Sequence, residues 1–168
     1  MKNILSFLMI TIAVVVNTSC AETSYTEERS NAREAAKAAF NLAPIDPNQE
    51  NEHIQYYLPS GFKVEREKPN NILLKSRRQE YILFYNQHES DQSDVIYDTA
   101  ISQIDYDVND TYYHDDRFGF LLMTPLNDET VEITVGIGGV KITTQSKVSK
   151  ITDEAKKMMF IANSVEVK

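Results

Sequence analysis

Apolar and polar positions repeat along the chain with two different periods, one typical of helices and one typical of strands. Residues 24–42 carry small apolar side chains at spacings of three and four, which predicts a helix with one buried stripe. The members of this stripe are Ala32, Ala35, Ala36, Ala39 and Phe40. Ser24 and Glu27 fit a capping box at the start of the helix, and Pro44 lies just beyond its end. We expect this shallow stripe either to pack on a sheet or to contact another protein.

Between residues 54 and 86 the pattern changes to short segments, of which the first three are separated by turns with Pro, Gly or Asn and the last by Arg77-Arg78-Gln79. The expected strands cover residues 54–58, 62–67, 72–76 and 80–86. In the last strand the alternating sets are Tyr81, Leu83 and Tyr85 on one face and Ile82 and Phe84 on the other. Strands of a few residues that are joined by tight turns indicate antiparallel pairing.

A second helix is expected over residues 94–104, where the apolar positions again lie close to helical spacing. These positions are Val95, Ile96, Ala100, Ile101 and Ile104. Ser93 can cap the start of this helix. A strand through Tyr97 and Ile101 is the alternative. Residues 105–116 follow and are rich in Asp, and we expect them to form a polar loop.

The last third of the chain predicts further strands and a closing helix. Strands are expected over residues 117–124, 130–137 and 140–144, with Gly138-Gly139 as a bulge or tight turn. Thr152 should cap a helix that continues to about residue 163. Its inward-facing side chains would be Ala155, Met158, Met159 and Ala162. Residues 164–167 can then return as a short edge strand.

These elements together predict the α+β class. We expect residues 24–168 to form one domain, built on a mostly antiparallel sheet of about six strands. Helices should lie at its N-terminal end, in its middle and at its C-terminal end. A segment of this length can bury a hydrophobic core of its own.

The first part of the chain has a different character. Lys2 is followed by a mostly apolar run, Ile4 to Val16, that carries no charge. This run is shorter than the roughly 20 residues that a membrane-spanning helix needs. Thr18 and Ser19 are small residues that directly precede Cys20, the only cysteine in the chain. This order of charge, apolar run and small residues is typical of a secretory signal peptide.

The sequence Thr18-Ser19-Cys20 resembles the end of the lipobox of bacterial lipoproteins. That resemblance implies a signal peptide over 1–19, a diacylglycerol on Cys20, a tether over 20–23 and a protein anchored on the extracytoplasmic face of the cell membrane. An ordinary signal peptide cut nearby, which leaves Cys20 as a free thiol, is the alternative. The stretch 135–144, with Met158-Met159 and 162–165, looks like small uncharacterised lipoproteins of Gram-positive bacteria, which implies no specific activity.

The charge of the chain limits the kinds of partner that it can attract. It has 17 Lys and Arg against 25 Asp and Glu, a formal net charge of -8. An acidic protein has no electrostatic reason to bind nucleic acid or anionic lipid headgroups. Because Cys20 has no partner cysteine, an intrachain disulfide is excluded. Stability outside the cell must then come mainly from packing.

A candidate metal site lies in the acidic stretch 105–116. Asp105, Asp107 and Asn109 occupy alternate positions, and Asp116 follows at the spacing of the last ligand of an EF-hand calcium loop. The stretch therefore resembles such a loop, although Asp110 stands where the turn requires Gly. We treat these four residues as a weak candidate for Ca²⁺. A solvated acidic loop is the alternative.

Catalytic motifs do not stand out in the sequence. His53, His88 and His114 are scattered without metal-ligand spacing, and no serine elbow accompanies them. Arg77-Arg78 and nearby Lys75 form the densest basic cluster, which could contact an anionic wall polymer or a partner's acidic patch. We expect a non-enzymatic surface lipoprotein that binds a protein or another envelope component. The alternatives are a small cell-envelope hydrolase and a structural or assembly factor.

Two kinds of surface would separate these possibilities. A deep pocket with convergent carboxylates would favour the hydrolase. A shallow face lined by tyrosine, or an exposed sheet edge, would favour the binding module.

Overall fold

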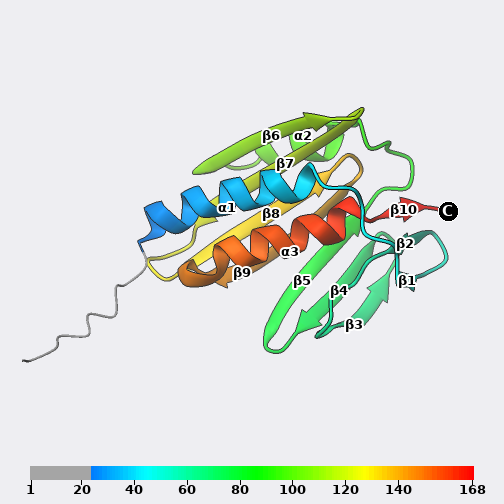
Figure 1. Cartoon of the computed structure of the whole chain (residues 1–168), viewed down its shortest axis with the longest axis horizontal. Helices are drawn as coiled ribbons and strands as arrows, with labels where there is room; N and C mark the ends of the chain where they lie inside the picture. The colour runs from blue at the N-terminus through cyan, green and yellow to red at the C-terminus, as the bar shows by residue number, and fades with distance from the viewer. Residues whose placement is uncertain (1–23) are drawn as a thin grey trace, which may run out of the picture.

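An antiparallel sheet of seven strands organises the fold, with the order β3-β4-β5-β9-β8-β7-β6 (Figure 1). The computed structural model describes residues 24–168, so the expected signal peptide 1–19, Cys20 and the tether 20–23 lie outside the described residues. The strands are β3 (Phe62–Lys68), β4 (Asn71–Ser76), β5 (Gln79–Tyr85), β6 (Val108–His114), β7 (Arg117–Pro125), β8 (Thr130–Ile137) and β9 (Val140–Lys147). The predicted α+β class is confirmed, with one more strand in the main sheet than expected.

Three helices lie on the two faces of this sheet. Helices α1 (Tyr25–Phe40) and α3 (Ile151–Asn163) pack side by side on one face. The short α2 (Val95–Ile101) lies on the other face, above β7. A small second sheet contains β1 (Gln49–Glu50), β2 (Ile54–Tyr56) and β10 (Glu166–Val167). Within residues 24–168, no helix is long and apolar enough to cross a membrane.

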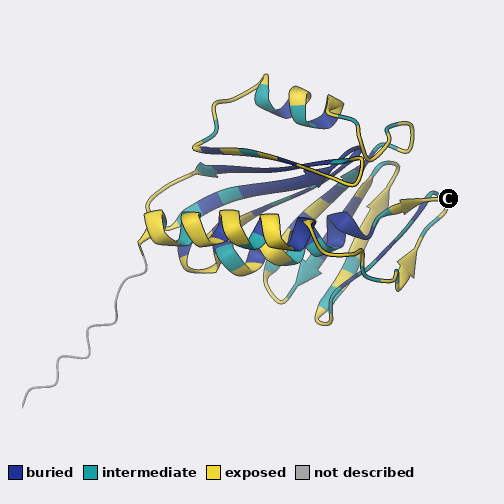
Figure 2. Cartoon of the chain, turned by 45° about the horizontal axis from the view of Figure 1, so that its top comes forward, coloured by how far each residue is buried: buried dark blue, intermediate teal, exposed yellow. Residues whose placement is uncertain are grey.

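The alanine stripe of α1 is buried inside the domain. Ala32, Ala36 and Ala39 have almost no exposed surface, and they lie in the core cluster that includes α3. Their small size lets the helices approach closely. The other side of α1 is exposed (Figure 2). The predicted capping box is wrong, because the Ser24 side chain makes no capping hydrogen bond. Instead the Ser24 carbonyl accepts the backbone N–H of Glu27.

The inward face of α3 was predicted correctly, and its cap was not. The four side chains expected to face inward are buried, namely Ala155, Met158, Met159 and Ala162. The helix begins one residue before Thr152, which therefore lies in its first turn and caps nothing. The Thr152 hydroxyl donates a 2.6 Å hydrogen bond to Glu28 Oε2 and so joins α3 to α1.

The two faces of β5 follow the predicted alternation. Tyr81, Leu83 and Tyr85 are buried beneath the helices, whereas Ile82 is 51% exposed on the opposite face. Gly138 and Gly139 form the predicted tight turn, since β8 and β9 pair up to Ile137 and Val140. The left-handed φ of +52° at Gly138 explains the use of glycine there.

Residues Val95–Ile101 form the expected helix, so the alternative of a strand through Tyr97 and Ile101 is wrong. The predicted cap is wrong, because Asp94 occupies the N-cap position and no side chain caps the helix. The Ser93 hydroxyl lies one residue earlier and accepts the Val95 N–H at 3.3 Å. The buried side of α2 packs on three apolar side chains of β7 that face away from α1 and α3. These are Phe118, Phe120 and Leu122.

Strand β6 is the element of the main sheet that the sequence did not predict. It lies within the expected acidic loop 105–116 and pairs with β7 from Val108↔Met123 to His114↔Arg117. Val108 and Tyr112 are buried on the helix side of the sheet. The prediction of a loop is wrong because the density of Asp residues hid this alternation.

Candidate functional site: the groove beside strand β6

The main sheet has two edge strands, and they differ in how open they are to another strand. Strand β3 carries a register shift between Val64 and Arg66 and exposes charged side chains over most of its length. Bulges and charges of this kind protect an edge from further pairing. Strand β6 pairs with β7 without a register shift, and no described strand pairs with its outer edge. The edge that remains open to pairing is therefore β6.

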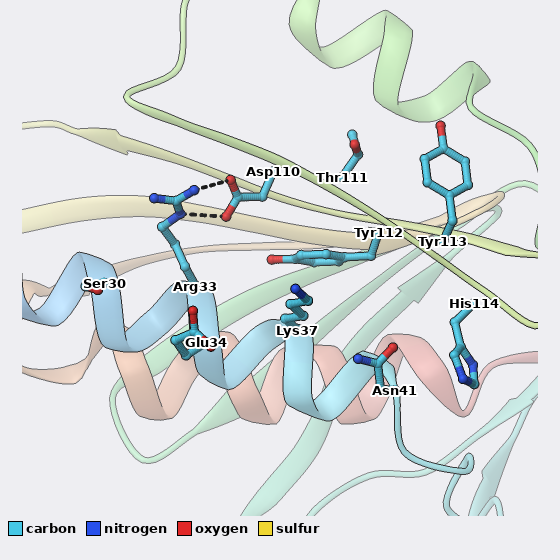
Figure 3. A pocket seen from close by; sticks show the side chains of 10 residues that line it. All are labelled: Ser30, Arg33, Glu34, Lys37, Asn41, Asp110, Thr111, Tyr112, Tyr113 and His114. Carbon is cyan, nitrogen blue, oxygen red and sulfur yellow. Dashed lines mark hydrogen bonds and ion pairs between the residues drawn. The ribbon is translucent and has the colours of Figure 1, made fainter.

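Helix α1 turns a polar stripe towards this open edge. The stripe repeats at spacings of three and four beside the buried alanines and consists of Ser30, Arg33, Glu34, Lys37 and Asn41. Together with residues 110–114, it lines an open cavity of 710 Å³ (Figure 3). We refer to this cavity, bounded by the α1 stripe and residues 110–114, as the β6 groove.

Paired charges hold α1 against β6. Arg33 Nε and Nη2 donate hydrogen bonds of 2.7 and 2.8 Å to the two carboxylate oxygens of Asp110. The carboxylate raises the pKa of the Arg33 guanidinium through these bonds. One turn earlier, Arg29 and the Tyr25 hydroxyl both donate to Asp107, at 3.0 and 2.6 Å. The bond from Tyr25, followed by that from Arg29, holds the pKa of Asp107 below its usual range.

Tyr112 forms the inner wall of the β6 groove. Its ring packs against Phe40, with 5.5 Å between ring centroids, and only 8% of the side chain is exposed. The hydroxyl is buried and has no hydrogen-bond partner among residues 24–168. Leaving such a group unsatisfied costs roughly 1–3 kcal/mol. Burial, and then the charge of Asp110, raise the pKa of Tyr112, so its hydroxyl stays protonated at neutral pH.

The remaining groups of the β6 groove are more exposed. Lys37 makes no ion pair within the described chain, and Figure 3 shows its amine directed at the Tyr112 side chain. At the far end, His114 Nδ1 lies 3.1 Å from Asp115. Tyr113 is 76% exposed and contacts Phe118 on the opposite face of the sheet. The groove thus combines an open backbone edge with an unpaired cation and a buried phenol.

The four residues of the calcium prediction do not converge. Asp107 is held by α1, whereas the Asn109 side chain accepts a 2.9 Å hydrogen bond from Tyr97 in α2. Asp116 lies in the turn after β6, and the seven residues of that strand span roughly 20 Å. No group of three or more His, Cys, Asp or Glu in residues 24–168 is placed to share a metal ion. Asp105 is exposed just before β6.

The other features that the sequence singled out also lie apart. Lys75 is within 4 Å of Glu65 and Glu80, so its charge is balanced on the sheet, and Arg77 occupies the β4–β5 turn. The His53 ring packs near Tyr85 of β5, and three strands of the sheet separate β5 from β6. The basic cluster and the histidines therefore do not form one site.

Sequence reasoning did not find Arg33, Lys37 and Tyr112 as a group. Their signal was the polar stripe of α1, which lies beside the predicted alanine stripe and carries no catalytic or metal-binding motif. The strand that faces it was hidden among acidic residues. Without β6 in place, nothing in the sequence indicated that this stripe lies beside a sheet edge.

The comparisons with known proteins add no relative to this description. No protein-family model matches the chain, and no curated protein matches it.

Proposed function

We propose that this protein is an extracytoplasmic lipoprotein, anchored in the cell membrane by lipid on Cys20, whose domain binds an extended segment of another envelope protein in the β6 groove. The observation that carries the proposal is the open edge of β6 beside a groove of 710 Å³. When an extended segment adds to a sheet edge, main-chain hydrogen bonds supply affinity and alternate side chains supply specificity. The β6 groove offers both kinds of contact.

A second copy of the chain fits this groove less well than a free segment does. Two β6 strands could pair edge to edge, but the second β6 would offer Asp110 and Tyr112 to the helix side of the sheet. In each copy these side chains already lie against Arg33 and Phe40 of its own α1. They cannot also fill the cavity of the partner. A segment that carries no helix of its own over these side chains can fill the cavity.

The shape of the groove also favours binding over hydrolysis. Its lining contains two carboxylates, Asp110 and Glu34, and both oxygens of Asp110 accept hydrogen bonds from Arg33. The cavity is open to solvent, as suits an extended polymer rather than a small substrate held away from water.

The proposed anchor would keep this groove near the membrane. Helix α1 begins at Tyr25, five positions after Cys20, and an extended chain of that length spans at most roughly 18 Å. Such a short tether favours partners that also lie at the membrane or in the adjacent envelope.

A selection of random peptides displayed on phage, with the full-length protein in detergent as bait, tests the binding mode. We expect enriched peptides to slow amide hydrogen exchange in residues 108–114 of β6. Exchange in 62–68, the other sheet edge, should not change. Protection of β3 alone, or of no strand, would contradict the proposal.

A matched pair of substitutions sharpens this test. A lysine on an edge strand discourages further pairing, so Tyr113→Lys should weaken peptide binding. Ile82→Lys places the same charge on an exposed position of an interior strand and should leave binding unchanged. Equal losses in both variants would show that the peptides do not add to β6.

A further inference from the structure

The β6 groove contains an unused hydrogen-bond donor and an unpaired cation that line the same cavity. The Tyr112 hydroxyl is buried without a partner among residues 24–168. Lys37 has no carboxylate within ion-pair distance in that part of the chain, and its amine is directed at Tyr112 (Figure 3). A donor without an acceptor and a cation without a counter-ion both favour an anionic oxygen.

We propose that Lys37 and Tyr112 bind the carboxylate of an Asp or Glu side chain carried by the extended segment that adds to β6. This inference rests on the proposed function, because the main chain of that segment brings the carboxylate beside Tyr112. The hydroxyl has almost no exposed surface, so the side chains of α1 must shift to let a carboxylate oxygen reach it. The side chain of Lys37 is exposed, and its long stem lets the amine follow the same carboxylate.

The charge of the groove favours a carboxylate over a phosphate. Arg33 directs two nitrogens at Asp110, so this cation is already balanced. Lys37 is then the one unpaired Lys or Arg among the groove residues of the described chain. A single negative charge matches it. A doubly charged phosphate would lack a second cation.

Two neighbouring groups set the geometry of the interaction. Glu34 is exposed one helical turn before Lys37, and it would repel a carboxylate that approached from its side. The Asn41 side chain, one turn after Lys37, lies away from the Tyr112 hydroxyl in Figure 3 and offers an amide to the main chain of the bound segment. The ligand oxygen should therefore reach the Tyr112 hydroxyl past Lys37, and Glu34→Gln should strengthen binding a few-fold.

The test uses the peptides selected from the random library as probes of the full-length protein. We expect them to share one Asp or Glu, and replacement of that residue by its amide should weaken binding at least about tenfold. Lys37→Gln and Tyr112→Phe should each cause a similar loss. With Tyr112→Phe, the difference between acid and amide peptides should shrink. Lys68→Gln, on the other sheet edge, is the matched control and should bind normally.

The Tyr112→Phe variant separates binding from folding. It removes an oxygen that has no partner, so its melting temperature should equal or exceed that of the wild type. Should this variant fail to fold, Lys37→Gln on the exposed side of α1 decides the same question. A loss of affinity for acid and amide peptides alike would contradict a carboxylate site.

The outcomes also separate this inference from the proposed function. Peptides that protect β6 from exchange but need no carboxylate would overturn the inference and leave the binding mode intact. A selection that yields no peptide at β6 would overturn both.

Discussion

The Tyr81 hydroxyl of β5 donates a 2.7 Å hydrogen bond to Glu154 Oε2 of α3 beneath the helix layer. Both side chains are buried, and Lys157 approaches the other Glu154 oxygen at 3.6 Å from the helix surface. This bond joins α3 to the half of the sheet that α1 does not reach. A buried carboxylate is tolerated there because it has a donor on one side and a cation on the other.

Tyr81→Phe should lower the free energy of unfolding by roughly 1–3 kcal/mol, because it leaves a buried acceptor without its donor. Urea unfolding followed by circular dichroism measures the change. Tyr112→Phe removes a hydroxyl of similar burial that has no partner, so it serves as the control and should leave the stability unchanged or raise it. Equal effects of the two substitutions would show that the Tyr81 bond contributes nothing.

Stability should fall at alkaline pH. Burial raises the pKa of Tyr56 to about 12, and burial also raises the pKa of Tyr25, Tyr81 and Tyr112. In the unfolded chain these phenols lose their protons near pH 10. Above that pH the unfolded state is favoured, since the folded state keeps the protons longer. Urea midpoints that stay constant from about pH 8 to about pH 11 would contradict this expectation.

Met158→Ala should destabilise the protein by roughly 2–5 kcal/mol, as is typical of a large-to-small change in a core. Met158 is fully buried between α3 and the sheet. Thermal or urea unfolding tests the prediction. Lys150 is exposed just before the same helix, so Lys150→Ala is a control that should change the midpoint little. An unchanged midpoint in Met158→Ala would mean that the helix face repacks without loss.

Cys20→Ala should abolish lipid attachment. Cys20 is the only cysteine in the chain and follows two small residues. Metabolic labelling with a fatty-acid analogue, followed by membrane fractionation, gives the readout. Equal labelling of wild type and variant would rule out the proposed anchor.

Millimolar Ca²⁺ should not raise the melting temperature. Asp107 already accepts hydrogen bonds from Tyr25 and Arg29, and β6 separates it from Asp116. Thermal unfolding in Ca²⁺, Mg²⁺ and EDTA makes the comparison. A rise that is specific to Ca²⁺ and lost in the Asp105→Asn/Asp107→Asn double variant would restore the calcium interpretation.

The sequence predicted most helices and strands because their periods are local. The alternation of Tyr81, Leu83 and Tyr85 has a period of two, and nothing nearby contradicts it. Strand β6 was missed because Asp110 occupies an inward position of its alternation. That position is acceptable only because Arg33, 77 residues earlier, supplies both hydrogen-bond donors. A long-range pair of this kind leaves no local signal.

The candidate site was hidden for the same reason. It forms where the polar stripe of α1 meets an edge strand. The sequence of neither element indicates that the other lies beside it. Lys37 and Tyr112 are unremarkable alone, since a surface lysine and a strand tyrosine are both common. Their relation depends on the strand order, in which β6 lies last.

The two charge pairs that fasten α1 to β6 also determine how the domain would carry a mechanical load. Under the proposed anchoring, tension from a bound segment enters at β6 and leaves towards the membrane through α1. Arg29–Asp107 and Arg33–Asp110 join these two elements directly, at 3.0 and 2.7 Å. Part of the pull can therefore pass straight from β6 to α1 through these pairs, without crossing the strands β3, β4, β5, β9 and β8.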